Sequence, residues 1–388
     1  MKQIVRHVSE SVTAGHPDKV CDIIAAAILD AATTASLIVG SKPRVAIEVS
    51  AKGDMGKSRG TLMLFGEVTL PKGVKLNYEK IARDTIASIG YTDPNYGFWY
   101  GMKDVILRIT QQSSEIAKGV GKKRTGAGDQ GIMFGGAISG EGPELMPLPI
   151  MIAHALTDRY TQVFKQKVLK YLRPDGKAQV VIEYNNEHPV SVENVTLAAS
   201  HNSHTKKSQV NEDLYKEIVK PVLDKFHYYL KDIKSQFTCN GAGAWTTFGP
   251  LADAGTTGRK IIVDTYGGFF PHGGGALNGK DWTKVDVAGP VGARYVAKAL
   301  VANGFAQKVQ IEVGYTIGRP DPDIININTF GTEKYSLSEI KTKAADFLDL
   351  SVDGIIDGLE LARPIYSHAA VGGWFGRREF PWEKVPLL

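Results

Sequence analysis

The sequence has little of several features that would each point to a class of protein. Its 388 residues include only two cysteines, Cys21 and Cys239, which are far apart and have no Cys-x-x-Cys partner. Such cysteine usage suggests a reducing compartment and argues against a disulfide framework or a thiolate metal site. No apolar run reaches about 18 residues, the length of a membrane span, and the N-terminus has no apolar signal segment. We therefore expect a cytoplasmic protein without a membrane partner.

Charge blocks and common catalytic motifs are missing as well. The formal net charge is +5, without a long block of Lys or Arg, so we expect no nucleic-acid partner. A positive site for an anionic small molecule explains the excess equally well. No Walker A loop, Rossmann fingerprint, HExxH motif or Ser-His-Asp arrangement is present. The chemistry is therefore predicted to be electrostatic, with no protein nucleophile.

What is present is the composition of a globular protein, 43% hydrophobic and 22% charged, with enough length for two or three domains. Apolar spacing and turn residues predict the order helix, strand, strand, helix three times, at intervals of roughly 135 residues. The predicted elements are 17–32, 44–50, 61–70 and 78–89; 150–171, 179–184, 190–198 and 211–230; and 289–303, 309–317, 324–330 and 337–348. Three copies predict an α+β fold of three domains, each with a sheet and helices packed on one face.

Local signals sharpen two of these helices. The helix at 211–230 is expected to bend at Pro221, and Ser336 with Glu339 predicts a capping box. The domain boundaries are predicted at 1–125, 126–249 and 250–388, with segments exchanged between the physical domains.

The stretch 253–286 carries the densest set of ligand-type residues. Two glycine-rich turns flank a short apolar run, 261–263, which we expect to be a buried strand. Glycine lets the backbone approach a ligand and turn its N–H groups toward it. Around these turns stand Arg259, Lys260, Lys280, Lys284, Asp253, Asp281 and Asp286. Cations for phosphate oxygens and carboxylates for Mg²⁺ fit a polyphosphate with bound metal. The alternative is a surface turn with solvated charges.

Other candidates lie outside this stretch. His16 and Asp18 stand at the N-terminus of the first predicted helix, which attracts anions. His16 could donate to a phosphate or bridging oxygen and Asp18 could bind Mg²⁺, or the segment is a plain turn with Asp18 favourably placed. Asp129 stands in a second glycine turn. Glu48 and Glu67 lie on neighbouring predicted strands, where a lone glutamate usually faces solvent.

Three further segments have weaker patterns. Residues 173–177 (Arg-Pro-Asp-Gly-Lys) predict a turn followed by a strand. Residues 51–60 form a polar, glycine-bearing hairpin connection. Residues 111–124, with two glycines and a basic end, are either a mobile lid over a site or a disordered surface loop.

Several of these motifs together resemble the methionine adenosyltransferase (S-adenosylmethionine synthetase) family. They are Gly-His-Pro-Asp-Lys at 15–19, Gly-Ala-Gly-Asp-Gln-Gly at 126–131, and the glycine-rich segments 258–268 and 273–281. The similarity runs from Val8 to the closing segment 375–384, essentially the whole chain. The motifs are long and stand in the right order, which makes the resemblance specific.

The resemblance implies an architecture and a reaction. The fold would be three α+β domains related by a pseudo-threefold axis, in a homodimer whose active sites are shared, paired further into a homotetramer. Methionine sulfur would attack C5′ of ATP to give S-adenosylmethionine and tripolyphosphate, which is hydrolysed to pyrophosphate and phosphate before release. The expected cofactors are two Mg²⁺ per site and K⁺, and the substrates are ATP and L-methionine.

The resemblance also assigns roles by position. His16 would hydrogen-bond the oxygen that leaves C5′, Asp18 and Asp286 would hold the two Mg²⁺, and Glu48 the K⁺. The methionine-binding positions are Glu67, Gln112, Asp129, Asp253 and Lys284. The ATP-binding positions are His16, Asp175, Lys177, Trp245, Asp253, Arg259, Lys260, Ala276 and Lys280. The expected catalytic residues are His16, Lys177, Arg259, Lys280 and Lys284, and the segment 111–124 falls on the mobile active-site loop of the family.

The sequence departs from the family pattern at a few places. Ala244-Trp245 replaces Arg-Phe, Leu277-Asn278 replaces Phe-Ser, Ala14 replaces Glu, and the 51–60 connection is longer. These departures bear on adenine contacts and substrate affinity, while the triphosphate residues are in place. The prediction is therefore an enzyme that makes S-adenosylmethionine. The alternative is a catalytically impaired, nucleotide-binding relative, with a nucleic-acid-binding protein a distant third.

Overall fold

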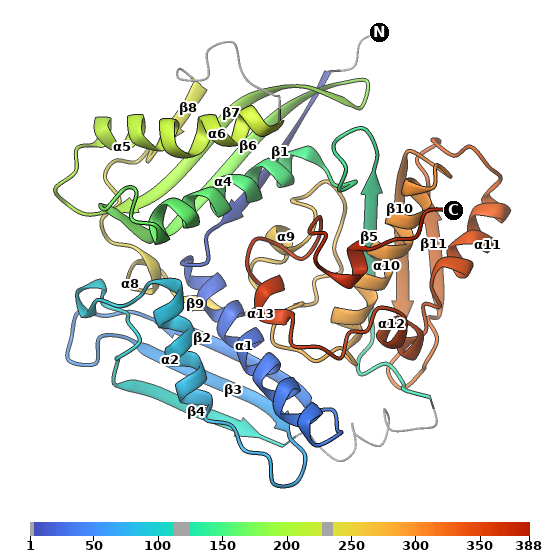
Figure 1. The fold of residues 1–388 in the computed structure, drawn as a ribbon, viewed down its shortest axis with the longest axis horizontal. Helices are drawn as coiled ribbons and strands as arrows, with labels where there is room; N and C mark the ends of the chain where they lie inside the picture. The colour runs from blue at the N-terminus through green and yellow to red at the C-terminus, as the bar shows by residue number, and fades with distance from the viewer. Residues whose placement is uncertain (1–3, 112–123, 227–235) are drawn as a thin grey trace.

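The computed structural model describes residues 4–111, 124–226 and 236–388. Within these ranges the chain forms three sheets, and α1, α4 and α10 lie toward the middle of the molecule between them (Figure 1). Each sheet has helices on one face, which confirms the predicted α+β fold. The largest apolar core joins the first and third sheets, and a second core lies under the helices of the remaining sheet.

The N-terminal sheet has the strand order β4-β3-β2-β9. Its strands are β2 (Arg44–Lys52), β3 (Thr61–Thr69), β4 (Asp104–Thr110) and β9 (Gly255–Thr256), covered by α1 (Pro17–Ile38) and α2 (Tyr78–Ile89), with a 3-10 turn at Pro94–Tyr96. Val45, Ile47 and Val49 alternate on the buried face of β2, as predicted, and Glu48 is exposed on the other. The hairpin that joins β2 to β3 matches the connection predicted at 51–60.

The central sheet has the order β1-β6-β7-β8. Its elements are β1 (Ile4–Val12), α4 (Leu148–Lys165), β6 (Leu172–Asn185), β7 (His188–His201), α5 (Lys207–Leu214), a π-helical turn (Tyr215–Val219), α6 (Lys220–Phe226) and β8 (Phe237–Cys239). Helix α4 ends at Lys165, earlier than predicted. The helix predicted at 211–230 begins at Lys207, and widens into the π turn just before Pro221, whose missing N–H cannot continue the hydrogen-bond ladder. Its last predicted residues lie outside the described ranges.

The C-terminal sheet has the order β11-β10-β5. Its elements are β5 (Gly131–Ile138), α10 (Val285–Ala302), β10 (Lys308–Tyr315), β11 (Ile324–Asn328), α11 (Leu337–Phe347) and α12 (Val352–Gly358). The capping box of Ser336 and Glu339 is present at α11, as predicted. The short helices α8 (Gly249–Ala252), α9 (Ile261–Asp264) and α13 (Tyr366–Ala369) and a last 3-10 turn at Pro381–Glu383 complete the described elements.

Each sheet borrows one strand from another third of the sequence. Strand β1 pairs with β6, β5 pairs with β10, and β9 pairs with β2, all antiparallel. Segments far apart along the chain are therefore brought together at the sheet edges. One consequence is that the edge of β2 receives both the start and the end of the stretch 253–286, because Ala46 also bridges to Lys280.

Two local predictions are wrong. The apolar run 261–263 is a turn of helix in α9, in which the Asp264 N–H bonds to the carbonyl of Lys260 at 2.9 Å and Ile262 is exposed. The run is only three residues long, so its β-branched composition could not distinguish the two states and tertiary contacts decided. Residues 173–177 lie within β6, at a bulge between Leu172 and Gly176, and not in a turn before a strand.

Helix α1 is apolar for structural reasons. It is long enough and its mean hydropathy of 1.6 is high enough to cross a membrane, but 67% of that window is buried inside the protein. It packs on β2 and β9, against α2, and beneath α13. Burial on several sides accounts for its composition, since a helix that is apolar all round is typical of a protein core.

Candidate functional site

The N-terminus of α1 places His16 and Asp18 next to each other. His16 is the N-cap residue in an extended conformation, Pro17 opens the helix, and the N–H of Asp18 donates to Nδ1 of His16 at 3.2 Å. A proline restricts the residue before it to extended backbone. The imidazole is therefore held over the first turn of the helix.

Gly15 lets this turn press against the central sheet. A Cβ at Gly15 would lie 2.3 Å from the carbonyl oxygen of Pro174, so any side chain there would displace backbone. The buried hydroxyl of Tyr91 donates to the carbonyl of Gly15 at 2.5 Å. His16 thus follows a segment fixed from two sides, beside the strand that carries Asp175 and Lys177.

Asp18 is buried, at 2% exposure, yet surrounded by donors. Its carboxylate accepts from Nζ of Lys260 at 2.8 Å and from the N–H of Thr256 at 3.0 Å, and Nε of Arg259 lies 3.7 Å away. Burial by itself raises the pKa of this carboxyl, but the Lys260 and Thr256 hydrogen bonds outweigh burial and lower it. Asp18 is therefore ionised at neutral pH.

His16 is neutral at the same pH. Burial first, and then the positive charge of Lys260, lower the pKa of His16 to about 3. Lys177, which pairs with Glu10 at 3.1 Å, adds to this effect. Because Nδ1 accepts the Asp18 N–H, we assign the single ring proton to Nε2. The first cluster (His16, Asp18, Lys177, Arg259, Lys260) thus combines cations, one carboxylate and a neutral donor.

A buried ion group under this cluster was not predicted from the sequence. Lys19, 1% exposed, forms ion pairs with Asp264 and, at 3.1 Å, with Asp22. Asp22 in turn accepts the N–H of Gly258 at 2.8 Å. These contacts fix the segment of Arg259 and Lys260 against α1. The sequence signals were Lys19 in the motif at 15–19 and Asp264 in the segment 258–268.

A second cluster forms at the N-terminus of α10. Nζ of Lys280 lies 2.5 Å from the carboxylate of Asp286, which is in the first turn of the helix. Lys284 is the N-cap residue; burial lowers its pKa, against the opposing charges of Asp281 and then Asp129. Gly275 permits the close approach of Asp286, because a Cβ there would lie 2.2 Å from the carboxylate. The second cluster is Lys280, Lys284, Asp286 and Asp129.

Glu48 and Glu67 lie on the uncovered face of the N-terminal sheet. Both are exposed. Glu67 is the cross-strand partner of Ala46, and Ala46 bridges to Lys280 on its other side. Glu48 stands two residues further along the same face of β2. The sheet therefore brings both glutamates to the side where the second cluster begins.

The predicted adenosine contacts gather near the start of α8. The N–H of Gly249 donates to Asp175 at 2.8 Å, and burial, which the Asp253 charge reinforces, raises the pKa of Asp175 to about 7. Trp245 is half-buried a few residues before, and its backbone N–H donates to Nε2 of His201 at 3.3 Å. Ala276 lies against Gly258 at the edge of the first cluster.

Not all predicted residues meet. Gln112 and the segment 112–123 lie outside the described residues. In the part of the chain that the structure describes, no group of three or more His, Cys, Asp and Glu side chains is close enough to hold a metal ion. Asp18 and Asp286 pair with different lysines, and the cavity that Asp286 lines measures only about 10 Å³, too small for an adenine nucleotide.

Known protein families match this chain in three consecutive segments. Three S-adenosylmethionine synthetase profiles match in order: the N-terminal domain at residues 5–114, the central domain at 124–245 and the C-terminal domain at 247–384. Together they cover almost the whole chain. The chain belongs to the S-adenosylmethionine synthetase family.

Individual relatives agree with the profiles. An S-adenosylmethionine synthase of Thermus thermophilus is 43% identical over 393 residues, covering 97% of this chain and 95% of the relative. One of Helicobacter pylori is 44% identical over 389 residues, covering 99% and 97%. The resemblance stated from the motifs, and with it membership of a methionine adenosyltransferase family, is confirmed.

Proposed function

We propose that this chain synthesises S-adenosylmethionine from ATP and L-methionine. The methionine sulfur forms a bond to C5′ of ATP as the bond from C5′ to the triphosphate oxygen breaks, and tripolyphosphate leaves. Water then hydrolyses tripolyphosphate to pyrophosphate and phosphate. Family membership supports the overall synthesis, and the first cluster supports the way the first step is catalysed.

The observation that carries the proposal is the neutral His16 beside an ionised Asp18. As the sulfur attacks, negative charge grows on the oxygen that leaves C5′. The Nε2–H of a neutral His16 can donate to that oxygen without charge repulsion from Lys260 or Arg259, which serve the phosphate oxygens. A fixed donor aimed at developing charge stabilises the transition state more than the ground state.

The residues present also fit the expected metals. Mg²⁺ in phosphate sites takes one or two carboxylates and completes its shell with phosphate oxygens and water. Asp18 and Asp286 each offer one carboxylate that is now paired with a lysine, and Glu48 offers an exposed carboxylate for K⁺. When bound, the metal ions would neutralise the triphosphate charge.

We propose further that the complete site is shared in a homodimer, which pairs into a tetramer. Asp129 and the two glutamates are exposed, and the cavity that the described residues form at Asp286 measures only about 10 Å³. Within this site Glu67, Asp129, Asp253, Lys284 and Gln112 would bind methionine. Trp245 would stack on adenine, near Asp175 and Ala276. The domains 1–125, 126–249 and 250–388 would each take one strand from another, as the sheet pairings indicate.

The direct test incubates purified protein with ATP, L-methionine, Mg²⁺ and K⁺ and measures S-adenosylmethionine, pyrophosphate and phosphate. Formation of all three at steady state is expected. An intact protein that binds ATP without forming S-adenosylmethionine would instead support a catalytically impaired relative.

The role of His16 has its own test. His16→Ala should slow S-adenosylmethionine formation by about 10²–10³-fold, the usual cost of one such donor. Hydrolysis of added tripolyphosphate breaks a P–O–P bond farther along the chain and should fall much less. Equal losses in both rates would contradict a role specific to the first step.

A further inference from the structure

Asn278 stands at the junction of the two cation-bearing segments. Its side chain is 2% exposed, and its Nδ2 donates to Oδ2 of Asp264 at 3.0 Å. Its Oδ1 accepts from the indole Nε1–H of Trp374 at 3.1 Å. An indole N–H only donates and a carboxylate only accepts, so the amide has one orientation that satisfies both partners.

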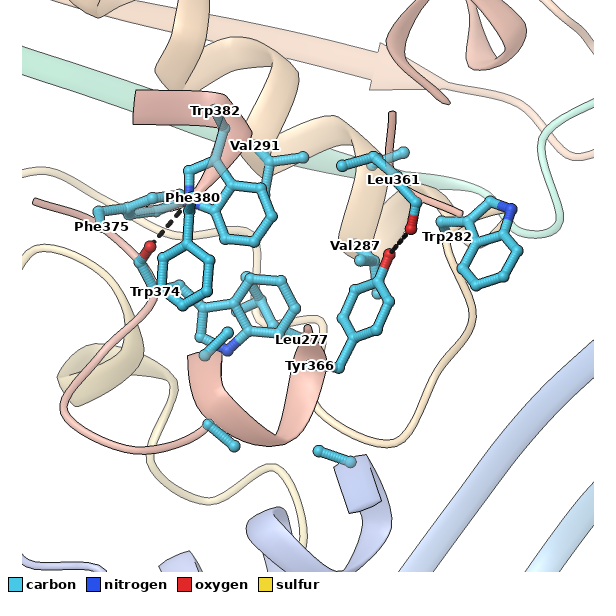
Figure 2. Packing of buried hydrophobic residues seen from close by; sticks show 14 of the residues in the cluster. Leu277, Trp282, Val287, Val291, Leu361, Tyr366, Trp374, Phe375, Phe380 and Trp382 are labelled. Carbon is cyan, nitrogen blue, oxygen red and sulfur yellow. Dashed lines mark hydrogen bonds between the residues drawn. The ribbon is translucent and has the colours of Figure 1, made fainter. Parts of the chain in front are cut away.

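Trp374 holds the same aspartate a second time. Its backbone N–H donates to the carbonyl of Asp264 at 2.9 Å. The indole is fully buried in an aromatic group, stacked on Trp382 and close to Tyr366, with Leu277 in the same core (Figure 2). Gly373 allows the approach, since a Cβ there would lie 2.5 Å from the ring of His154. The C-terminal segment therefore hydrogen-bonds the backbone of Asp264 directly and its carboxylate indirectly, through Asn278.

Asp264 in turn contacts residues that support the first cluster. Its other carboxylate oxygen pairs with Lys19, the neighbour of Asp18, and its N–H bonds to the carbonyl of Lys260. Lys260 reaches back to Asp18. Asp264, Lys19, Asp18 and Lys260 therefore form a closed ring of contacts, which includes the Asp18 carboxylate predicted to hold Mg²⁺. Asp264 is fully buried within it.

The same amide bears on the second cluster through the chain. Asn278 is followed by Gly279, whose carbonyl accepts the N–H of Ile47 at 2.8 Å, and then by Lys280. Fixing the Asn278 side chain therefore fixes the start of the segment that presents Lys280 to Asp286. The two phosphate-side segments are joined at one buried side chain.

We propose that Asn278 and Trp374 are positioning residues that set the phosphate-binding cations of both clusters. This inference rests on the proposed function in taking ATP and tripolyphosphate as ligands. The Asn278 amide joins a carboxylate and an indole because it offers a donor and an acceptor at opposite sides of one short side chain. A serine hydroxyl at this position would be too short to reach both partners at once.

The test compares Asn278→Ser, which replaces the amide with a single short hydroxyl, with Trp374→Phe, which keeps a ring but removes the indole donor. Tyr315→Phe is the matched control, because it removes another buried donor, the hydroxyl bound at 2.7 Å to the carbonyl of Leu350, a residue of neither cluster. Each variant is assayed at least about 15 °C below its own Tm, a wide margin for a domain of this size. The readouts are KM for ATP, KM for methionine and the Kd of inorganic tripolyphosphate by calorimetry.

For Asn278→Ser and Trp374→Phe we expect KM for ATP and Kd for tripolyphosphate to rise by about tenfold. This is less than the loss of activity of about 10²-fold that a 1 Å misplacement of a site residue can cause. KM for methionine should change less than twofold, and Tyr315→Phe should change none of the three. The double variant should lose no more than either single one, because the two residues act on the same carboxylate.

The inference would be overturned if Asn278→Ser and Trp374→Phe left KM for ATP and Kd for tripolyphosphate unchanged. It would also be overturned if Tyr315→Phe changed them equally. Absence of S-adenosylmethionine from the wild-type protein would overturn the proposed function instead. The tripolyphosphate constants of the same proteins would still decide the role of Asn278 and Trp374.

Discussion

The N-termini of α1 and α10 carry the same short arrangement in two environments. In each, the second residue of the helix is an aspartate, Asp18 or Asp286, paired with a lysine from the stretch 253–286. The Asp18 side chain is 3% exposed and that of Lys260 15%, against 15% for Asp286 and 26% for Lys280. Asp18 also accepts a backbone N–H. The first arrangement is closed within the chain, while the second is more open.

The corresponding helix of the central unit has no such residue. Helix α4 begins with Leu148 and Pro149 and has no acidic residue in its first turn. An aspartate at a helix N-terminus is favoured by the helix dipole, but a lysine partner is not needed for that effect. The repetition of the Asp–Lys pair in two of three equivalent places therefore points to ligand binding, and it matches the two Mg²⁺ sites proposed.

The largest effect should come from removing either carboxylate. Asp18→Asn and Asp286→Asn should each reduce S-adenosylmethionine formation by about 10²–10³-fold, since each loses charge stabilisation at the triphosphate. Asp18→Asn should also lower Tm more, because it leaves Lys260 without its buried partner. Initial rates at several Mg²⁺ concentrations and thermal unfolding measure both. If Asp286→Asn retained full activity, the two helix ends would not be functional equivalents.

A mixture of the two inactive variants should recover activity. If a site combines the first cluster of one subunit with the second cluster of its partner, a dimer of Asp18→Asn with Asp286→Asn contains one intact site and one with both changes. After dissociation and random reassociation, half the dimers are mixed, so about a quarter of the wild-type rate should return. The control is each variant treated alone. No recovery, despite subunit exchange shown by differently tagged chains, would place both clusters in one subunit's site.

How much of this comparison the sequence could predict depends on the range of the contacts. Helix α2 has the predicted limits at Tyr78 and Ile89, and the Ser336 capping box was predicted, because the signals lie within a few residues. Asp18 and Asp286 were singled out for the same reason, as carboxylates at predicted helix starts or beside glycine turns.

The contacts that hold these residues were not predictable in this way. Lys19 and Asp264 are 245 residues apart, and Asn278 and Trp374 are 96 apart. The spacing of apolar residues along the sequence does not indicate which distant side chain pairs with a buried charge. The short run 261–263 failed for a related reason, because the partners of Asp264 fix it as a helical turn despite its strand-like composition. Local sequence patterns predicted the helices and strands, whereas contacts between distant residues determine what holds the site residues in place.

A smaller effect concerns the charge of His16. Since burial and Lys260 lower its pKa to about 3, the neutral donor should persist across pH 6–8. The pH profile of S-adenosylmethionine formation should then have the same shape in the wild type and in His16→Gln, which offers a neutral amide donor, and differ only in height. A decline below about pH 6.5, the ordinary pKa of histidine, in the wild type alone would show a titrating imidazole. That result would mean that the first cluster is not closed enough to keep His16 neutral, and the contrast with the more open second cluster would be lost.

The smallest effect extends the comparison to Asp175, a buried carboxylate without a lysine partner of the kind that Asp18 has. Burial raises its pKa to about 7, while an aspartate in the unfolded chain titrates near 3.9. The folded protein therefore holds a proton that the unfolded chain releases. This contribution to stability is complete below about pH 4 and is lost as the pH rises through about 7.

Asp175→Asn removes this titration but keeps an oxygen for the N–H of Gly249. Between pH 5 and pH 8 the Tm of the ligand-free wild type should fall by about 2–4 °C more than that of the variant, the shift expected for about 2–3 kcal/mol in a chain of this length. Asp357→Asn, at an exposed carboxylate of α12, should follow the wild type. Parallel curves for the wild type and Asp175→Asn would mean that Asp175 is ionised in the folded protein. A cation would then have to compensate it as Lys260 compensates Asp18, and the difference between the two buried carboxylates would disappear.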